Sequence, residues 1–377
     1  MTPSYACRRA VGRAPRHRHC ALAFSLVELL TVIFIISLLI GILIPSLGAA
    51  RNAAKKSKTN SDIRAIGTAI ELFKNDNERE FPHTNGYPPS FAHPPIKGYS
   101  FDAHLGQFPF LEDVSDSNPP VVYGAHWLPP MLMGVDNLGY VKRSSVPPSL
   151  RSRPWRWYSI DPHEDGEARP LPRAQFYIEP DGVKTVLTQN LRGRRPPQSQ
   201  METLFPDWDN MKDLPVMVDA FDQPILYYVA NKHGRSTNMA ADVRDENNLY
   251  TGGEQEQGPP YYFHQDNLGF TGAGSNDPDE ITGWNFGGGE HAIARSGHDL
   301  RAPQLLHPDG RETFAHFIMD PAQRRSFEMR IADEEVYPPG NTLLKPVNPD
   351  SFLLISAGVD GRYGTKDDVA NFPLSAE

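Results

Sequence analysis

Cysteine is nearly absent from the chain, which has 2 in 377 residues, Cys7 and Cys20. Both lie within residues 1–23, ahead of a long apolar run. If this leader is removed, the remaining chain has no cysteine, so its fold cannot depend on disulfide bonds in any compartment.

Recognisable catalytic motifs are also missing. The sequence has no Gly-x-Ser-x-Gly, His-Glu-x-x-His, Walker loop or Cys-x-x-Cys pair. The run Gly-Gly-Gly-Glu-His at 287–291, with His298 and Asp299 nearby, follows no standard spacing of metal ligands. We interpret that run as a polar loop, and we expect a protein that is not an enzyme.

Acidic residues are absent from the first 23 positions, which hold five arginines: Arg8, Arg9, Arg13, Arg16 and Arg18. Because the whole chain carries −9, the residues after this leader carry −14. An acidic body is not suited to binding a phosphate backbone, so we expect no nucleic-acid partner.

The chain does contain one long apolar run, FSLVELLTVIFIISLLIGILI at 24–44, with Glu28 as its only charge. About 20 apolar residues are enough for a membrane-spanning helix, whereas the apolar region of a secretory signal has roughly 7–15. Pro45 follows, and a helical pattern continues beyond it, where we expect Pro45 to bend or melt the helix. Residues 24–45 are therefore predicted to be a transmembrane helix.

Glu28 is unusual, because a carboxylate within a membrane helix costs about 2.5 kcal/mol or more on insertion scales. One interpretation is a plain signal anchor with a tolerated Glu near its end. The other is a charge kept for a partner: cleavage between Ala23 and Phe24 would create an ammonium group four residues before Glu28. In a bundle of such helices, Glu28 of one subunit would then pair with the Phe24 amine of a neighbour and fix the stagger.

The segment Ala-Phe-Ser-Leu-Val-Glu-Leu-Leu at 23–30 resembles the signal of type IV prepilins and type II secretion pseudopilins. The resemblance implies cleavage by a prepilin peptidase before Phe24, N-methylation of Phe24, and a role for Glu28 in assembly. Pro45 matches the helix-interrupting proline of the family. The family prefers Gly before the cut, and this chain has Ala23. Orientation, with the leader in the cytoplasm and the body in the periplasm, also comes from the resemblance.

The helix is predicted to continue over residues 46–81, where Ile63, Ile66, Ile70 and Phe73 form one apolar stripe. Proline is abundant after it: 21 of the 36 prolines fall within 81–215. Regular structure should be sparse there, so we interpret 82–215 as a loop-rich, partly packed insertion. Residues 231–300 look like a second insertion.

The last part of the chain combines a strand-like run at 351–358 with an acidic loop that contains Asp360, Asp367 and Asp368. Asp-Gly turns are one interpretation. Calcium is the other, because it takes six to eight oxygen ligands and Gly361 and Gly364 would let the loop curl. The loop is similar to the C-terminal loop of the major pseudopilin, and this implies a structural calcium held by Asp360 and Asp367 or Asp368, with carbonyls from around 356–363.

We therefore expect an α+β fold, in which a long N-terminal helix packs on a small antiparallel sheet with large loop-rich insertions. The predicted ranges are a leader at 1–23, a transmembrane helix at 24–45, its periplasmic continuation at 46–81, the insertion at 82–215 and a β domain at 216–377.

The resemblance favours a structural subunit of a type II secretion pseudopilus in the bacterial inner membrane. Its expected partners are copies of itself, other pseudopilins, the prepilin peptidase and an inner-membrane assembly platform. Two alternatives stay open. One is a type IV pilin for adhesion, motility or DNA uptake, and the other is a single-pass anchored ectodomain with a binding or enzymatic role.

Overall fold

The computed structural model describes most of the N-terminal helix and the core of the body. The described residues are 26–79, 81, 84–90, 122–151, 157–158, 162–163, 165–166, 169–205, 208–232, 234, 261–272, 283–287, 290–294, 313–320 and 345–374. The chain divides into two compact units, Met1–Arg51 and Asn52–Glu377.

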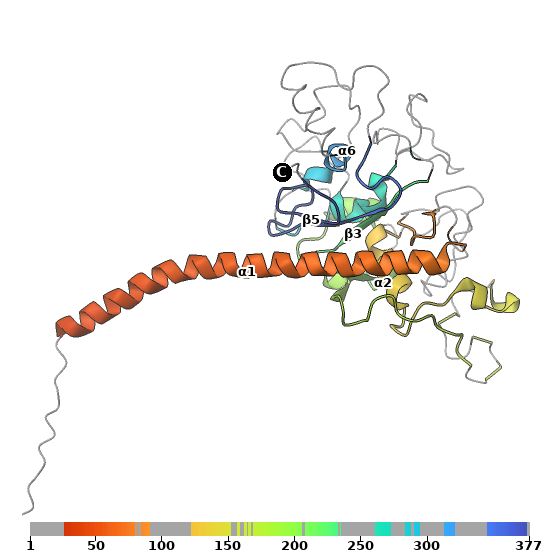
Figure 1. The fold of residues 1–377 in the computed structure, drawn as a ribbon, viewed down its shortest axis with the longest axis horizontal. Helices are drawn as coiled ribbons and strands as arrows, with labels where there is room; N and C mark the ends of the chain where they lie inside the picture. Colours follow the sequence, from red (N-terminus) through yellow and green to blue (C-terminus); the bar gives the residue numbers. More distant parts are fainter. Residues whose placement is uncertain are drawn as a thin grey trace, which may run out of the picture. The chain divides into compact units, whose positions relative to one another are not determined.

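The longest element is the helix α1, Leu26–Asn77, with 52 residues (Figure 1). Pro45 lies inside it, and the helix is not interrupted there. A proline removes only one backbone hydrogen bond from the ladder, and the hydroxyl of Ser46 donates to the carbonyl of Leu43 at 2.8 Å. The helix continues through Pro45, and the local melting expected from the sequence is not observed. The helix ends at Asn77, four residues before the predicted position 81, and the Asn77 amide donates to the carbonyl of Phe73 at 2.8 Å.

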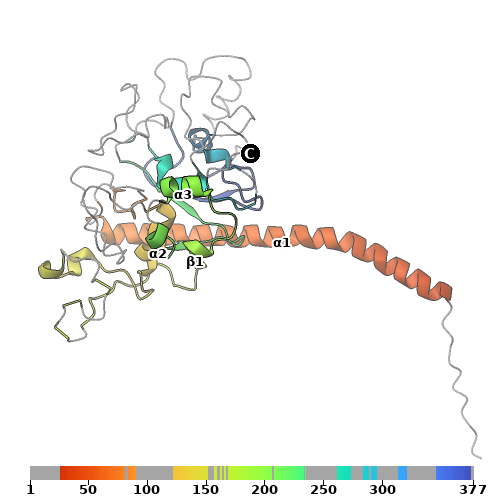
Figure 2. The same cartoon turned by 180° about the vertical axis from the view of Figure 1, so that it is seen from behind.

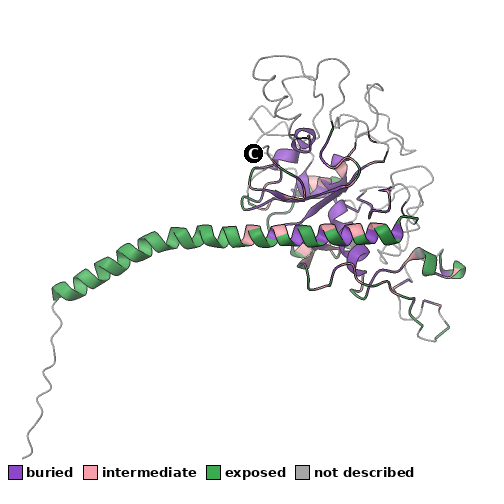
Figure 3. Ribbon diagram, viewed as in Figure 1, coloured by how far each residue is buried: buried purple, intermediate pink, exposed green. Residues whose placement is uncertain are grey.

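The second half of α1 packs on the body through the predicted apolar stripe. The side chains of Ile63, Ile66, Ile70 and Phe73 are at most 2% exposed. Figure 3 shows buried and exposed residues alternating along this half of the helix. The three- and four-residue spacing places these side chains on one helix face, and the predicted stripe is confirmed.

The main sheet has three antiparallel strands in the order β3-β4-β5: Leu226–Val229, Phe352–Ser356 and Val369–Ala370. β4 pairs with β3 from Leu226↔Ile355 to Val229↔Phe352, and with β5 through Ile355↔Ala370 and Ser356↔Val369. Every residue of β3 and β4 is buried. This sheet with the long helix confirms the predicted α+β fold.

A second, two-stranded sheet pairs β1, Thr185–Leu187, with β2, Pro215–Met217, in antiparallel register. The helix α2, Gly124–Met133, packs against β2 and β3, and Figure 2 shows α2 and β1 from the rear. All ten residues of α2 are buried, so the range 82–215 contributes a full element to the main core. The predicted boundary at 215/216 falls inside β2.

Close contact between α2 and β3 depends on one glycine and one amide side chain. A Cβ on Gly124 would lie 2.0 Å from the carbonyl oxygen of Tyr227, so only glycine allows this approach. Asn267 bridges the two elements: its Oδ1 accepts from the amide of Ala125 at 3.0 Å, and its Nδ2 donates to the carbonyl of Tyr227 at 2.7 Å. The bridge satisfies buried backbone groups that no strand or helix serves.

Short helices complete the described body. The α-helices are α3 Gln198–Leu204, α4 Trp208–Met211, α5 Leu268–Thr271 and α6 Phe314–Phe317. The 3-10 helices are η4 Arg143–Ser145, η5 Pro148–Leu150, η7 Thr188–Asn190, η8 His264–Asn267 and η9 Ala292–Ala294. They pack mostly around the one large core to which α1, α2 and both sheets contribute.

Candidate functional site

The first candidate site is the N-terminal half of α1, where all the large apolar side chains are exposed. Its most hydrophobic 18-residue window has a mean hydropathy of 2.9 and no buried residue. Among the described residues, this is the one helix whose length and apolar composition suffice to cross a membrane. Apolar residues occur on every face of it, so one flat partner cannot cover them all. Lipid or several neighbouring helices are needed.

Glu28 lies in the first turn of α1 and is exposed. The carbonyl of Glu28 accepts a hydrogen bond from the hydroxyl of Thr31 at 2.9 Å. Ala23 and Phe24, the predicted cleavage and methylation residues, lie outside the described residues. Pairing of Glu28 with the Phe24 amine therefore stays a prediction.

The second candidate site is the loop between β4 and β5, which begins after Ser356 and ends before Val369. Three of its glycines have positive φ: Gly358 at 66°, Gly361 at 74° and Gly364 at 91°. A Cβ on Gly358 would also lie 2.4 Å from the carbonyl oxygen of Asp367. The sequence predicts the curl of the loop from Gly361 and Gly364 and a strand-like run that ends at Gly358, whereas β4 ends two residues earlier, at Ser356.

Asp360 and Asp367 are brought together across this loop. The Oδ2 atom of Asp367 accepts from the amides of Val359 at 2.5 Å and Asp360 at 3.0 Å. Burial raises the pKa of Asp360, and the neighbouring charge of Asp367 raises it further. Burial also acts to raise the pKa of Asp367, but hydrogen bonds from Thr365 and from the two amides lower it overall. Two neighbouring carboxylates favour a shared proton or a cation between them.

The third acid, Asp368, is only 2% exposed and braces the loop from inside. Its Oδ2 atom accepts from the amide of Gly364 at 2.7 Å, and its Oδ1 atom lies 3.2 Å from the hydroxyl of Thr365. Burial raises the pKa of Asp368 well above its usual value. The sequence left Asp367 and Asp368 as alternatives for the second side-chain ligand of a cation. Of these two, Asp367 is the one that lies beside Asp360.

The donor set of the loop fits a hard cation such as calcium, which prefers oxygen ligands. It combines two adjacent carboxylates with the carbonyls of a loop that turns through three left-handed glycines. Within the described ranges, no group of three or more Asp, Glu, His or Cys side chains is placed to hold a metal ion. Backbone carbonyls would therefore have to supply most of the shell.

A buried carboxylate that sequence reasoning did not assign, Asp219, fastens the end of β4, where the loop begins, to the turn before β3. It accepts hydrogen bonds from the amides of Phe221 at 2.7 Å and Gln223 at 2.9 Å, and from the hydroxyl of Ser356 at 2.5 Å. Burial raises the pKa of Asp219 to about 6. The bond to Ser356 joins residues that are 137 positions apart in the sequence.

His291 has a structural role in holding the same loop. Its Nδ1 atom accepts from the amide of Tyr363 at 3.1 Å, and its Nε2 atom donates to the carbonyl of Trp284 at 2.8 Å. With both nitrogens engaged, the ring supports the loop from one side. His298 and Asp299 lie outside the described residues.

Two curated proteins are similar to part of this chain. The type II secretion system core protein G of Escherichia coli (strain K12) is 39% identical over 62 residues, which are 16% of this chain and 42% of that protein. The type II secretion system core protein G of Klebsiella michiganensis is 31% identical over 86 residues, 20% of this chain and 60% of that protein.

The chain therefore covers less than two thirds of the length of either relative. No protein-family model matches the chain, and no solved structure matches it significantly. The apolar helix and the similarity to a secretion-system protein are both consistent with a membrane-anchored protein. Over the matched residues, this chain is therefore similar to core protein G of type II secretion.

Proposed function

We propose that this chain is a structural subunit of a periplasmic pseudopilus in a type II secretion system. One observation carries the proposal: the first half of α1 exposes all its large apolar side chains, in a chain that is partly similar to core protein G. An anchored enzyme would use such a surface only to stay in the membrane, whereas a filament subunit would use it at two stages. It holds the subunit in the membrane before assembly and packs on neighbouring helices afterwards.

In the proposed mechanism, the prepilin peptidase cuts between Ala23 and Phe24 and methylates the new amine. The subunit waits in the inner membrane with its body in the periplasm. Glu28 then pairs with the Phe24 amine of a neighbour already in the filament. In an apolar surrounding, this ion pair is strongly favoured over an unpaired Glu28, so it selects one axial register.

The remaining partners follow from the same pathway. Copies of this chain and other pseudopilins form the filament, and an inner-membrane assembly platform adds the subunits. The role is mechanical and non-enzymatic, in line with the similarity to core protein G.

Mass spectrometry of the mature N-terminus tests the pathway most directly. The chain purified from its native membrane should begin at N-methylated Phe24. An uncut Met1, or a cut after Pro45, would remove the basis for assembly through this helix. A peptidase-deficient strain is the control, and it should yield the uncut chain.

We also propose that calcium occupies the loop between β4 and β5 and stabilises it. Asp360 and Asp367 would supply the carboxylate oxygens, while carbonyls of the loop from around residue 356 to 363 complete the shell. The adjacent carboxylates support this, because a divalent cation offsets the repulsion between them. The site is structural in this proposal and takes no part in any reaction.

A further inference from the structure

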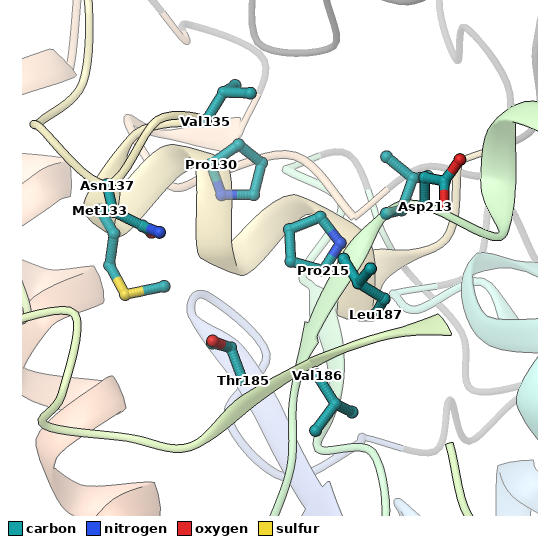
Figure 4. Close-up of a pocket in the computed structure, with 10 residues that line it drawn as sticks. Pro130, Met133, Val135, Asn137, Thr185, Val186, Leu187, Asp213 and Pro215 are labelled. Atoms are coloured by element: carbon teal, nitrogen blue, oxygen red, sulfur yellow. The ribbon is translucent and has the colours of Figure 1, made fainter. Parts of the chain in front are cut away.

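A cavity of about 320 Å³ lies beside β1, between that strand and the end of α2 (Figure 4). This volume is within the range of about 300–1,000 Å³ that is typical of ligand pockets. Asn137, Thr185 and Asp213 are its polar lining residues. Its wall is otherwise mainly apolar, with side chains from Pro130, Met133, Val135, Leu187, Leu214 and Pro215.

The strand that borders the cavity has a free backbone edge. Hydrogen bonds to β2 use alternate residues: the carbonyl of Lys184 accepts from Val218 at 2.9 Å, and the amide of Thr188 donates to Leu214 at 2.9 Å. In an antiparallel pair, the residues between such bonded positions point their backbone groups the other way. The amides and carbonyls of Thr185 and Leu187 therefore face away from β2.

No hydrogen bond within the described part of the chain joins the amides of Thr185 or Leu187 to another segment. The two residues are separated by about 6.7 Å along the strand, the repeat over which an extended peptide presents its own backbone groups. A row of unpaired donors and acceptors at this spacing is a template for strand addition. A free strand edge can form backbone hydrogen bonds along an extended peptide, which a compact small molecule cannot match.

The charge around β1 indicates what kind of strand fits. Residues 183–201 contain Lys184, Arg192, Arg194 and Arg195 and no acid, in a chain of net charge −9. Asp222 offsets part of this charge, since it pairs with Lys184 and Arg192. The basic charge that remains lies beyond the C-terminal end of β1, at Arg194 and Arg195.

Arg195 places positive charge near the far end of β1. Its guanidinium lies over the ring of Trp208 at 4.6 Å and within 3.5 Å of the carbonyl oxygen of Gln189. The side-chain amide of Gln189 in turn donates to Asp213 at 2.6 Å, so this acid of the cavity is hydrogen-bonded to a neutral group and keeps its charge. Lys184 directly precedes the strand at its other end.

We propose that the edge of β1 and its cavity bind an extended, acidic segment of a partner protein by strand addition. Backbone groups of the segment pair with Thr185 and Leu187, and alternate apolar side chains enter the cavity. An acidic side chain at one end of the segment faces Arg195. The proposal does not depend on the filament role of the chain.

Fluorescence anisotropy with the full chain in detergent tests this docking. The probe is a labelled eight-residue peptide in which valine alternates with glutamate or threonine, and the control peptide has lysine in place of glutamate. We expect the acidic peptide to bind at least about tenfold more tightly than the basic one, a difference of about 1.4 kcal/mol. Equal binding of the two peptides overturns the proposal.

Two variants with matched controls locate the site. Thr185→Pro removes an outward amide that β2 does not use, and it should weaken binding at least about tenfold, while Thr185→Val should leave it nearly unchanged. Leu187→Asp, at a side chain that is 37% exposed, should also weaken binding of the acidic peptide. Arg195→Glu should do the same, whereas Arg64→Glu on the exposed face of α1 should not. Unchanged binding in Leu187→Asp and Arg195→Glu contradicts the proposal even if Thr185→Pro fails to fold.

A second copy of this chain is the other candidate occupant, and sedimentation of the full chain in detergent distinguishes it. If Leu187→Asp abolishes a concentration-dependent dimer while the acidic peptide does not bind, the edge belongs to a copy of the chain. That result overturns the acidic-segment proposal.

Discussion

His126 shows how closely a single side chain can be specified by its surroundings. Its Nε2 atom lies 3.0 Å from the hydroxyl of Thr188, whose own proton is directed to the carbonyl of Leu214 at 2.8 Å. The hydroxyl therefore accepts from Nε2, and Nδ1 accepts from the amide of Tyr123 at 3.3 Å. Only the neutral ring with its proton on Nε2 fits both bonds.

Folding stability should consequently fall below about pH 6.5. Burial lowers the pKa of His126 to about 3 and the pKa values of His264 and His291 to about 4. Between these values and about 6.5, the unfolded chain binds protons that the folded chain excludes. Each of the three histidines then removes about 1.4 kcal/mol per pH unit as the pH falls. Asp219 acts in the opposite sense over about pH 4–6, because its pKa is raised to about 6, and burial of Asp368 raises its pKa and acts in the same sense as Asp219. Together these two acids offset two of the three histidines.

Urea denaturation of the full chain at several pH values between about 5 and 7.5 measures this slope. His126→Gln should reduce the slope by about 1.4 kcal/mol per pH unit, whatever its effect on absolute stability. A slope identical to that of the unaltered chain would show that His126 takes up its proton in the folded state.

Among the elements, the second half of α1 has the clearest division between buried and exposed positions. Ile70 is fully buried, and Leu72, two residues later, is 51% exposed. Truncation of Ile70 leaves a cavity under the helix, whereas truncation of Leu72 removes side-chain surface already in contact with solvent.

Ile70→Ala should therefore destabilise the body by about 2–5 kcal/mol, and Leu72→Ala by less than about 1 kcal/mol. Thermal or chemical unfolding of both variants, followed by near-ultraviolet circular dichroism, checks this difference. Equal losses would mean that the helix packs on the body through a different face.

The loop between β4 and β5 leads to the prediction on metal removal. Chelation should lower the melting temperature, because a ligand that binds only the folded state adds about 2.7 kcal/mol at a concentration one hundred times its dissociation constant. Asp360→Asn combined with Asp367→Asn should abolish the response to added calcium, whereas Asp209→Asn, at a side chain that is 92% exposed, should retain it. If the unaltered chain melts at one temperature with and without chelator, the calcium proposal fails.

Local patterns predicted some elements well and others poorly, for a physical reason. The stripe on α1 and the buried strand β4 follow from the spacing of apolar residues along a short stretch. The helix α2 does not, since Pro129 and Pro130 lie inside it and each lacks a backbone donor. Burial of all ten residues outweighs that local cost, and burial depends on distant segments such as β3.

The candidate sites also contain some features that the local sequence predicted and others that it did not. The acids of the C-terminal loop were visible because Asp360, Asp367 and Asp368 are close in sequence. The bond from Ser356 to Asp219 was not visible, since it spans 137 positions. The free edge of β1 could not be predicted from the sequence either, because it depends on which distant segments pair with the strand and which do not.

For the molecule as a whole, the two halves of α1 differ in their surroundings. Its second half is part of the folded core, and its first half carries exposed apolar side chains from Leu26 to Leu47. Assembly and folding can therefore be altered separately, which a single compact domain would not allow.

Glu28→Gln should reveal this separation. The melting temperature of the body should not change. The yield of filaments, measured in a strain that carries the assembly machinery, should fall at least about tenfold, because the ion pair that sets the register is lost. Glu202→Gln, on the exposed face of α3, is the control and should assemble normally. Normal filament yield from Glu28→Gln would exclude the pairing with Phe24.

The position of β4 in the middle of its sheet has a consequence for biosynthesis. β3 and β5 each pair with β4 and not with each other. The sheet therefore cannot begin to form until Phe352–Ser356 has been translated. Until then, the apolar stripe of α1 has no sheet to cover it, and long-range pairing of this kind is slow. The emerging chain should therefore be a substrate for holding chaperones and for proteases.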